Sequence, residues 1–430
     1  MNIPSIETAS QQEIRVYQEQ KLGEALRYVA QNSPYYKALF EKEGIDISTI
    51  QTIEDLQKIP VTTKEHLQEF NDDFLCVPKS AIVDYATTSG TSGKPVTFGI
   101  TDKDLDRLAY NEAISFACSG IKEGDVVQLM TTIDRRFMAG LAYFLGIRKL
   151  KAGIIRVGAG VPELQWDSIL KYKPAYLITV PSFLLKLIEY AETHDIDYNA
   201  SGIKGAVCIG EPLRNQDFSP NILSKKITSK WDIKLFSTYA STEMSTAFAE
   251  CEHSIGGHHH PELIIAEVLD ANDVPVVDGA PGELAVTTLG IEGMPLVRFK
   301  TGDIVQMHNE PCACGRNTTR IGPVIGRKQQ MIKYKGTTLY PPAMIDLLQS
   351  FSEIQSHVIE ISTNSLGTDE ILIKAAAANP TEELLTEIKD HFRAKLRVTP
   401  KIVFVSIQEL NTIMFNPMSR KPVNFIDNRV

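Results

Sequence analysis

The chain has 430 residues, 43% of them hydrophobic and 23% charged, with a formal net charge of −9. This length and composition predict a globular protein of roughly two or three domains, and the acidic balance argues against binding along a nucleic-acid backbone. The first residues lack the basic start and apolar run of a secretory signal, and no run of about 18 apolar residues predicts a membrane span. We therefore expect a cytoplasmic protein that binds neither nucleic acid nor membrane.

Apolar residues near helical spacing predict an amphipathic helix over residues 11–31, early in the chain. Farther on, short apolar runs alternate with helical patterns, which indicates a layered α/β architecture. We expect buried strands at 126–130, 175–180 and 206–209, and helices at 104–116 and 183–190.

The rest of the chain changes character twice. Residues 263–306 combine Val-rich runs with turn residues, which predicts a smaller β-rich subdomain. Beyond Arg327, strand and helix patterns alternate over about 100 residues, enough for a compact α+β domain. We expect a large N-terminal domain over residues 1–326 and a small C-terminal domain over 327–430.

Residues 87–95, Thr-Thr-Ser-Gly-Thr-Ser-Gly-Lys-Pro, lie between an apolar run at 81–83 and an alternating run at 96–100, which predicts a strand–loop–strand element. A Walker A loop needs four residues between its glycines and a helix after its lysine. Here two residues separate Gly90 from Gly93, and Pro95 follows Lys94. Backbone N–H groups, hydroxyls and the Lys94 ammonium could still bind phosphate oxygens. The alternative is a polar surface turn.

This loop resembles the phosphate-binding loop of adenylate-forming enzymes. From about residue 11 to its end, the chain resembles the phenylacetate–CoA ligases of that superfamily, also through Asn-Ser-Pro-Tyr-Tyr at 32–36. The resemblance implies a large layered α/β domain with a β-rich subdomain, followed by a small mobile α+β domain. It also implies a reaction in which ATP and a carboxylic acid form an acyl-AMP and pyrophosphate, and CoA then takes the acyl group. The phosphate-binding residues would be Ser89, Gly90, Thr91, Ser92, Gly93 and Lys94.

Two further segments resemble nucleotide-binding elements of the family. They are Gly210, Glu211 and Pro212, and then Tyr239, Ala240, Ser241, Thr242 and Glu243. The first would line adenine chiefly with its backbone. In the second, Tyr239 would lie against adenine, with Thr242 and Glu243 near phosphate and Mg²⁺, an ion that prefers hard oxygen ligands. Ala240 replaces the usual glycine, and an ordinary strand-to-helix turn is the alternative.

The junction of the two domains and the C-terminus also resemble the family. Asp303 would accept hydrogen bonds from both ribose hydroxyls, because a carboxylate is an acceptor with two oxygens. Arg327 would contact ribose or phosphate at the hinge, where Gln-Gln at 329–330 replaces the usual Asp-Asp. Lys335 and Gly336 would line the entry for CoA. Lys421 matches the catalytic lysine that bridges the carboxylate and the α-phosphate.

Cys312-Ala-Cys314-Gly-Arg resembles a string found in some phenylacetate–CoA ligases, and Cys251 and His258 match the remaining ligands of a metal site. Three cysteines and one histidine form a closed set for structural Zn²⁺. His253, His259 and His260 are rivals for the histidine position. The alternative is free thiols beside a solvated histidine run, since six cysteines in this chain are too sparse for a disulfide scaffold.

Arg135 and Arg136 stand where phenylacetate ligases have a Tyr- and Gly-rich segment of the acid pocket. The acid is therefore open among phenylacetate, other aryl acids and other organic acids, and both arginines could equally face CoA phosphates or solvent. ATP, CoA and a small carboxylic acid are the expected partners, with a homodimer as a candidate assembly. Two alternatives remain: an adenylating enzyme that passes AMP or acyl to a non-CoA acceptor, such as an amine, carrier protein or cofactor, and a zinc-bearing binding module without activity.

Overall fold

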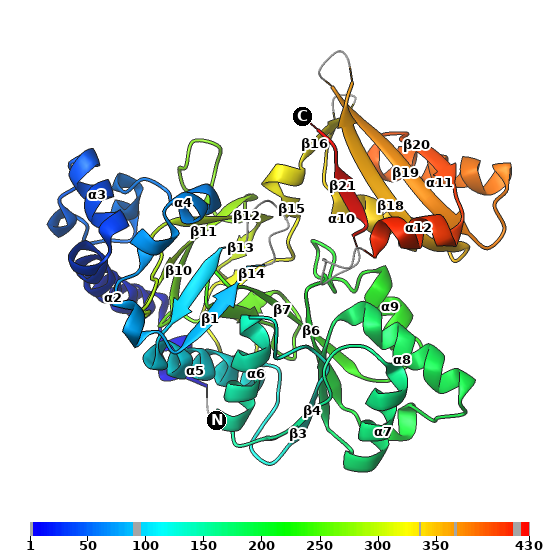
Figure 1. The fold of residues 1–430 in the computed structure, drawn as a ribbon, viewed down its shortest axis with the longest axis horizontal. Coiled ribbons are helices and arrows are strands. Elements are labelled where there is room, and N and C mark those ends of the chain that lie inside the picture. Colours follow the sequence, from blue (N-terminus) through cyan, green and yellow to red (C-terminus); the bar gives the residue numbers. More distant parts are fainter. Residues whose placement is uncertain (1–2, 89–95, 335–336, 365–367, 416–422, 430) are drawn as a thin grey trace. The chain divides into compact units, whose positions relative to one another are not determined.

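A computed structural model describes residues 3–88, 96–334, 337–364, 368–415 and 423–429 (Figure 1). The chain forms two compact units. The first comprises residues 1–301 and 305–323, and the second comprises 302–304 and 324–430. The predicted division into moving domains at 326/327 remains a prediction.

A nine-stranded sheet organises the first unit, in the order β13-β14-β9-β8-β7-β6-β5-β3-β4. Its parallel part contains β3 (Val126–Leu129), β4 (Gly153–Arg156), β5 (Tyr176–Thr179), β6 (Gly205–Ile209) and β7 (Lys234–Ser241). Its antiparallel part contains β8 (Thr246–Ala249), β9 (Gly257–His258), β13 (Met307–His308) and β14 (Arg320–Ile321). The apolar runs predicted as strands at 126–130, 175–180 and 206–209 are confirmed as β3, β5 and β6.

Helices cover both faces of this sheet because successive strand residues point to opposite sides. Ile178 and Val207 pack with α5 (Asp102–Cys118) and α6 (Met138–Lys149). Their chain neighbours Leu177 and Ala206 pack on the other face, against α7 (Pro162–Tyr172), α8 (Pro181–Thr193) and α9 (Ile222–Thr228). Burial on both faces explains why these strands read as continuous apolar runs.

The N-terminal helices pack against the rest of the first unit (Figure 1). The short α1 (Ser5–Thr8) precedes α2 (Gln11–Asn32), which opens on a capping box of Ser10 and Glu13. The chain then restarts in α3 (Pro34–Glu43), where the Ser33 hydroxyl accepts from the Tyr36 N–H and proline occupies the first turn. The motif at 32–36 is therefore a helix stop and restart, and Tyr36 is fully buried.

Short elements complete the first unit. The segment predicted to be β-rich forms β10 (Ile264–Leu269), β11 (Gly282–Thr288) and β12 (Phe299–Val305), and residues 302–304 of β12 belong to the second unit. On either side of residues 89–95, β1 (Asp84–Thr87) and β2 (Thr97–Ile100) pair antiparallel, which confirms the predicted strand–loop–strand element. The first strand begins at Asp84 and not in the apolar run at 81–83, because a 3₁₀ turn ends at Ala81.

The second unit is an α+β domain. Its sheet has the order β20-β19-β18-β21, and β15 (Gly326–Arg327) pairs with Asp303 and Ile304. The elements are β16 (Ile332–Tyr334), β17 (Thr337–Leu339), α10 (Pro341–Gln349), β18 (Ile354–Thr363), β19 (Asp369–Ala377), α11 (Glu382–Leu396), β20 (Lys401–Phe404), α12 (Ile407–Met414) and β21 (Phe425–Asp427). Ile359, Ile373 and Phe392 are fully buried in its core. The predicted fold class is confirmed.

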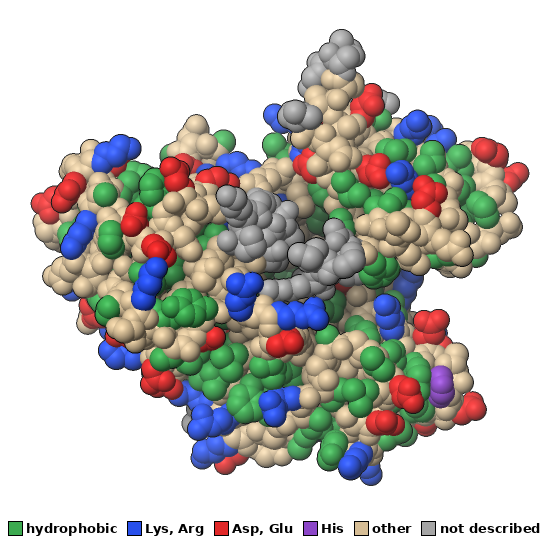
Figure 2. Space-filling model, viewed as in Figure 1, with side chains coloured by type: hydrophobic (Ala, Val, Ile, Leu, Met, Phe, Trp, Pro, Cys, Tyr) green, Lys and Arg blue, Asp and Glu red, His purple; other side chains and the backbone are tan. Residues whose placement is uncertain are grey.

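None of the helices in the described part of the chain has the length and apolarity to cross a membrane. On the face shown in Figure 2, basic and acidic side chains are interspersed and form no continuous basic stripe among the described residues.

Candidate active site and metal centre

The carboxyl ends of β6 and β7 bring two of the predicted nucleotide segments together. These neighbouring strands are parallel, with Ile209 opposite Thr238, so Gly210 follows β6 beside Tyr239 of β7. Gly210 has φ 78°, a left-handed conformation that favours glycine. Ligands of open α/β sheets bind at this edge, outside the carboxyl ends of the strands.

The loop after β6 is held in place by hydrogen bonds of its side chains. The Glu211 carboxylate accepts from the Ser182 backbone N–H and from the Ser182 hydroxyl, both at 2.9 Å, and so caps α8. Farther along, Arg214 donates to the Leu235 carbonyl at 2.8 Å and pairs with the buried Glu250 at 3.3 Å. Glu211 therefore fixes the position of the loop, and the Pro212 carbonyl accepts from the Asn221 amide at 2.9 Å.

The segment 239–243 ends β7 and turns directly into β8, since Ser241 pairs with Thr246 across a hairpin. The strand-to-helix turn considered from the sequence is wrong, because the antiparallel return strand follows after only four residues. The Ser241 hydroxyl accepts from the Met244 N–H at 3.3 Å, and Ser245 takes φ 48°. Thr242 and Glu243 are half-buried in this turn.

Tyr239 is also half-buried, and its ring stacks on Phe248 of the return strand, with centroids 5.9 Å apart and planes 28° apart. Phe248 itself is fully buried. The hairpin therefore supports one face of an aromatic ring at the edge of the sheet, which suits stacking against a planar base.

Asp303 and Arg327, both predicted near ribose, are partners of one another in the second unit. They lie opposite each other in the β12–β15 pair, with Arg327 Nε 3.3 Å from Asp303 Oδ1. The Arg327 side chain is 50% exposed, against 13% for Asp303. A half-exposed pair of this kind contributes little stability, so both groups can exchange this contact for a ligand.

Several predicted residues lie outside the described part of the chain: Ser89, Gly90, Thr91, Ser92, Gly93, Lys94, Lys335, Gly336 and Lys421. The residues flanking the first loop are described. Thr88 and Val96 are joined by two hydrogen bonds of 3.0 Å, and the Thr87 N–H donates to the Arg136 carbonyl at 3.0 Å. Arg136 thus lies at the base of the loop, although its side chain is exposed.

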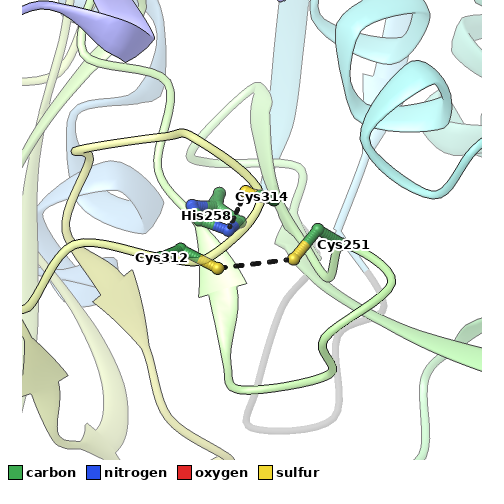
Figure 3. Close-up of side chains that lie close together, drawn as sticks. All are labelled: Cys251, His258, Cys312 and Cys314. Carbon is green, nitrogen blue, oxygen red and sulfur yellow. Dashed lines mark hydrogen bonds between the residues drawn. The ribbon is translucent and has the colours of Figure 1, made fainter.

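The Cys/His cluster gathers the four predicted metal ligands in the first unit (Figure 3). Their ligand atoms all lie within 4.8 Å of one another. Cys251 Sγ is 3.7 Å from Cys312 Sγ, and Cys314 Sγ is 3.5 Å from His258 Nε2. Tetrahedral Zn²⁺ with ordinary bond lengths requires about 3.8 Å between sulfurs and about 3.6 Å between sulfur and nitrogen. The residues therefore fit the ion.

Neighbouring groups orient two of these ligands. His258 Nδ1 lies 3.0 Å from the Thr318 hydroxyl, which turns Nε2 toward the sulfurs. The Arg316 guanidinium donates to Cys314 Sγ at 3.6 Å. The hydrogen bond between the Cys251 and Cys314 thiols lowers the pKa of Cys314 well below its usual range and raises the pKa of Cys251, and burial lowers the pKa of His258.

Two rivals of His258 have other roles. His259 Nε2 lies 2.9 Å from the Ile264 carbonyl, and His260 lies between Ser115 and Glu7, with its Nδ1 2.6 Å from Glu7 Oε1. Glu7 and His260 are fully buried.

Glu7 also ties the N-terminus to the metal cluster. It accepts from Arg316 Nε at 2.6 Å, and Arg316 in turn contacts Cys314. Nothing local in the sequence marks Glu7, because its carboxylate pairs with a residue 309 positions away.

These observations describe an α/β protein with a candidate ligand site at the carboxyl edge of a parallel sheet and, separately, a Cys/His cluster. The family model described as AMP-binding enzyme matches residues 35–292, more than half of the chain, and the protein belongs to this family.

Two curated relatives are phenylacetate–coenzyme A ligases. The one from Thermus thermophilus is 29% identical, over 88% of this chain and 84% of its own length. The one from Escherichia coli is 27% identical, over 91% of this chain and 90% of its own length. Among solved structures, a 2-hydroxyisobutyryl-CoA ligase in the postadenylation state, in complex with 2-HIB-AMP, superposes with a TM-score of 0.86 at 26% identity, covering 99% of this chain and 92% of its own.

Proposed function

We propose that the protein is an ATP-dependent acid–CoA ligase, which forms an acyl-AMP with release of pyrophosphate and then an acyl-CoA thioester with release of AMP. The observation that carries this proposal is the meeting of the Gly210 loop and the Tyr239–Glu243 hairpin at one edge of the sheet, in a chain of the AMP-binding enzyme family. The curated relatives named as CoA ligases match this chain over most of its length.

The chemistry needs groups that let a carboxylate approach a phosphate, since both carry negative charge. Glu243 is a half-buried carboxylate on a tight turn and would hold Mg²⁺, which supplies charge neutralisation to the phosphates. Tyr239 would support adenine, and Asp303 would accept from the ribose hydroxyls in place of its contact with Arg327. The loop at 89–94 would hold the departing pyrophosphate.

The acid is proposed to be phenylacetate or a related aryl or organic acid, because the relatives carry the phenylacetate name while a solved neighbour carries that of a hydroxy acid. Acid-dependent ATP–pyrophosphate exchange with phenylacetate, benzoate and 2-hydroxyisobutyrate tests the first half-reaction. Consumption of CoA thiol tests the second. Absence of exchange with every acid would refute the ligase, whereas exchange without CoA consumption would favour a different acceptor.

Lys421 is proposed as the catalytic lysine of adenylation. We expect Lys421→Ala to slow ATP–pyrophosphate exchange by roughly 100-fold or more, since both charge and orientation are lost. Thioester formation from supplied acyl-AMP should be spared, because the small domain rotates in the family and withdraws this residue. Equal loss in the two half-reactions would contradict this role.

We further propose that the Cys/His cluster holds one structural Zn²⁺, which would join the segment around Cys251 and His258 to the Cys312–Cys314 turn. Elemental analysis of purified protein should find about one zinc per chain. Cys312→Ser should lose the metal and lower the thermal midpoint. A matched change at Cys208, fully buried elsewhere in the sheet, should leave the zinc content unchanged. Full metal content in Cys312→Ser would contradict the assignment.

A further inference from the structure

Helix α5 carries three buried polar residues at intervals of four: Arg107, Asn111 and Ser115. This spacing places them on one face of the helix. Buried polar groups need partners, because an unpaired one costs about 1–3 kcal/mol. Arg107 and Asn111 find their partners on or beside the β7–β8 hairpin, which carries Thr242 and Glu243.

Arg107 is surrounded by backbone and hydroxyl oxygens. Its Nη1 donates to the Ser245 carbonyl at 2.7 Å, and its Nη2 donates to the Thr246 hydroxyl at 3.2 Å. The remaining bonds go to the carbonyls of Leu263, at 2.6 Å, and Leu289, at 2.7 Å. Burial lowers the pKa of Arg107 to about 10, which leaves the guanidinium charged at neutral pH.

Asn111 continues the same line of contacts one helical turn later. Its side-chain oxygen accepts from the Ala247 N–H at 3.1 Å. Residues 245, 246 and 247 of the hairpin are therefore each bound by α5 in succession. The distance between helix residues four apart is close to that between strand residues two apart, so Arg107 and Asn111 together fix how far β8 lies along α5.

Ser245 gives this contact a consequence for the site. It closes the turn that begins at Thr242, and its φ of 48° lies in the left-handed region that serine rarely adopts. Such a residue costs on the order of 1–3 kcal/mol and persists only where its surroundings hold it. The bond from Arg107 to the Ser245 carbonyl, together with the 3.2 Å bond from the Ser245 hydroxyl to the Thr242 carbonyl, holds it here.

We propose that Arg107 is a positioning residue for adenylation: it locks the strained Ser245 turn and thereby places Thr242 and Glu243 for the phosphates and Mg²⁺. This inference rests on the proposed function for its catalytic consequence. Its structural content, a turn held by the Arg107 guanidinium together with the Ser245 hydroxyl, stands on these contacts alone.

Arg107→Met removes the guanidinium and its hydrogen bonds but keeps much of the apolar volume of the side chain. We expect roughly a 100-fold slower ATP–pyrophosphate exchange with phenylacetate, the effect of misplacing a reacting group by about 1 Å, and a higher Mg²⁺ concentration for half-maximal rate. Thioester formation from supplied phenylacetyl-AMP should change less than about threefold, because the phosphates have then departed. Arg107→Lys should recover part of the exchange rate, since one donor still reaches the Ser245 carbonyl.

Ser245→Gly provides the decisive second change. Glycine adopts positive φ without strain. Although Ser245→Gly also removes the hydroxyl that bonds the Thr242 carbonyl, relief of the backbone strain should make ATP–pyrophosphate exchange about tenfold faster in the double variant Arg107→Met, Ser245→Gly than in Arg107→Met alone, equivalent to about 1.4 kcal/mol. Arg320→Lys is the matched control: Arg320 is also buried, but its acceptors, Ile255 and Glu310, lie outside the hairpin. Arg320→Lys should lower the free energy of unfolding without changing the Mg²⁺ concentration needed for a half-maximal rate of ATP–pyrophosphate exchange.

Hydrogen exchange separates failure of this inference from failure of the proposed function. In Arg107→Met, amide exchange should rise in a peptide covering residues 239–248 while α8 keeps its protection, whatever reaction the protein catalyses. Unchanged protection of that peptide, or equal loss of both half-reactions without rescue by Ser245→Gly, would overturn the positioning role. Absence of ATP–pyrophosphate exchange in the unmodified protein would refute the ligase. The amide hydrogen-exchange result would still decide the role of Arg107.

Discussion

Glu112 provides a quantitative test of the packing between α5 and α6. Its side chain is buried, one carboxyl oxygen accepts from the Asn111 amide at 3.0 Å, and the other has no partner among the described residues. The helices approach closely here, since a Cβ placed on Gly146 would lie 2.3 Å from the Glu112 Cβ. Burial raises the pKa of Glu112 from 4.5 to about 8. The folded protein therefore favours the neutral acid.

The sign and size of the effect follow from proton linkage. Between the unfolded and folded pKa values the native state binds a proton that the unfolded state does not, so the stability contributed by Glu112 is fully present below pH 4.5 and falls as the pH rises toward 8. Glu112→Gln keeps the shape of the neutral acid and removes the titration. Relative to the unmodified protein, the variant should gain roughly 3 kcal/mol in free energy of unfolding between pH 5 and pH 7.5.

Urea denaturation at both pH values measures this difference, with the slope of each transition checked for equal exposed surface. Glu189→Gln, on the exposed surface of α8, is the matched control for the same chemical change without burial, and it should shift stability by less than about 0.5 kcal/mol. If the curves of Glu112→Gln and the unmodified protein stay parallel from pH 5 to 7.5, the carboxyl group is not held neutral and the reasoning fails.

Three further changes test the core by urea denaturation. Glu7→Ala should cost roughly 3–5 kcal/mol because Arg316 loses its buried counter-charge; a loss under 1 kcal/mol would mean that water reaches the pair. Gly146→Ala should lower the free energy of unfolding by about 1–3 kcal/mol, because the added methyl group overpacks against Glu112 and this outweighs the better helix propensity of alanine. Any stabilisation would contradict the close approach of the two helices. Trp166→Ala should cost about 3–5 kcal/mol, since this indole is 1% exposed; a cost below 2 kcal/mol would show that the site collapses.

Local patterns predicted the elements well where apolar residues recur with a clear period. The predicted helix at 11–31 became Gln11–Asn32, and the predicted helix at 104–116 became Asp102–Cys118. Periodicity suffices here because each helix or strand buries a continuous apolar face. The β7–β8 hairpin was harder to predict, since a short polar turn carries no periodicity that distinguishes a following strand from a following helix.

Motifs in the sequence identified most residues of the candidate site, but not the side chains that contact and orient them. The choice among four neighbouring histidines depended on which imidazole the fold turns toward Cys314, and that is His258. The contact between Arg107 and Ser245 joins residues 138 positions apart, so no local pattern predicts it. A polar residue every fourth position in an otherwise buried helix is the one signal that could have drawn attention to Arg107 and Asn111.

By itself, the sequence determined the fold class and the main strands and helices, because apolar periodicity acts over neighbouring residues. Its short motifs indicated the kind of chemistry through their resemblance to a known family. Only the tertiary structure decided which side chains pair with one another around those motifs. Glu211 accepts from the first turn of α8, Asp303 pairs with Arg327, and Glu7 pairs with Arg316 beside the Cys/His cluster. The physical reason is that a buried polar group must find its partner wherever the packing of the sheet and helices brings one.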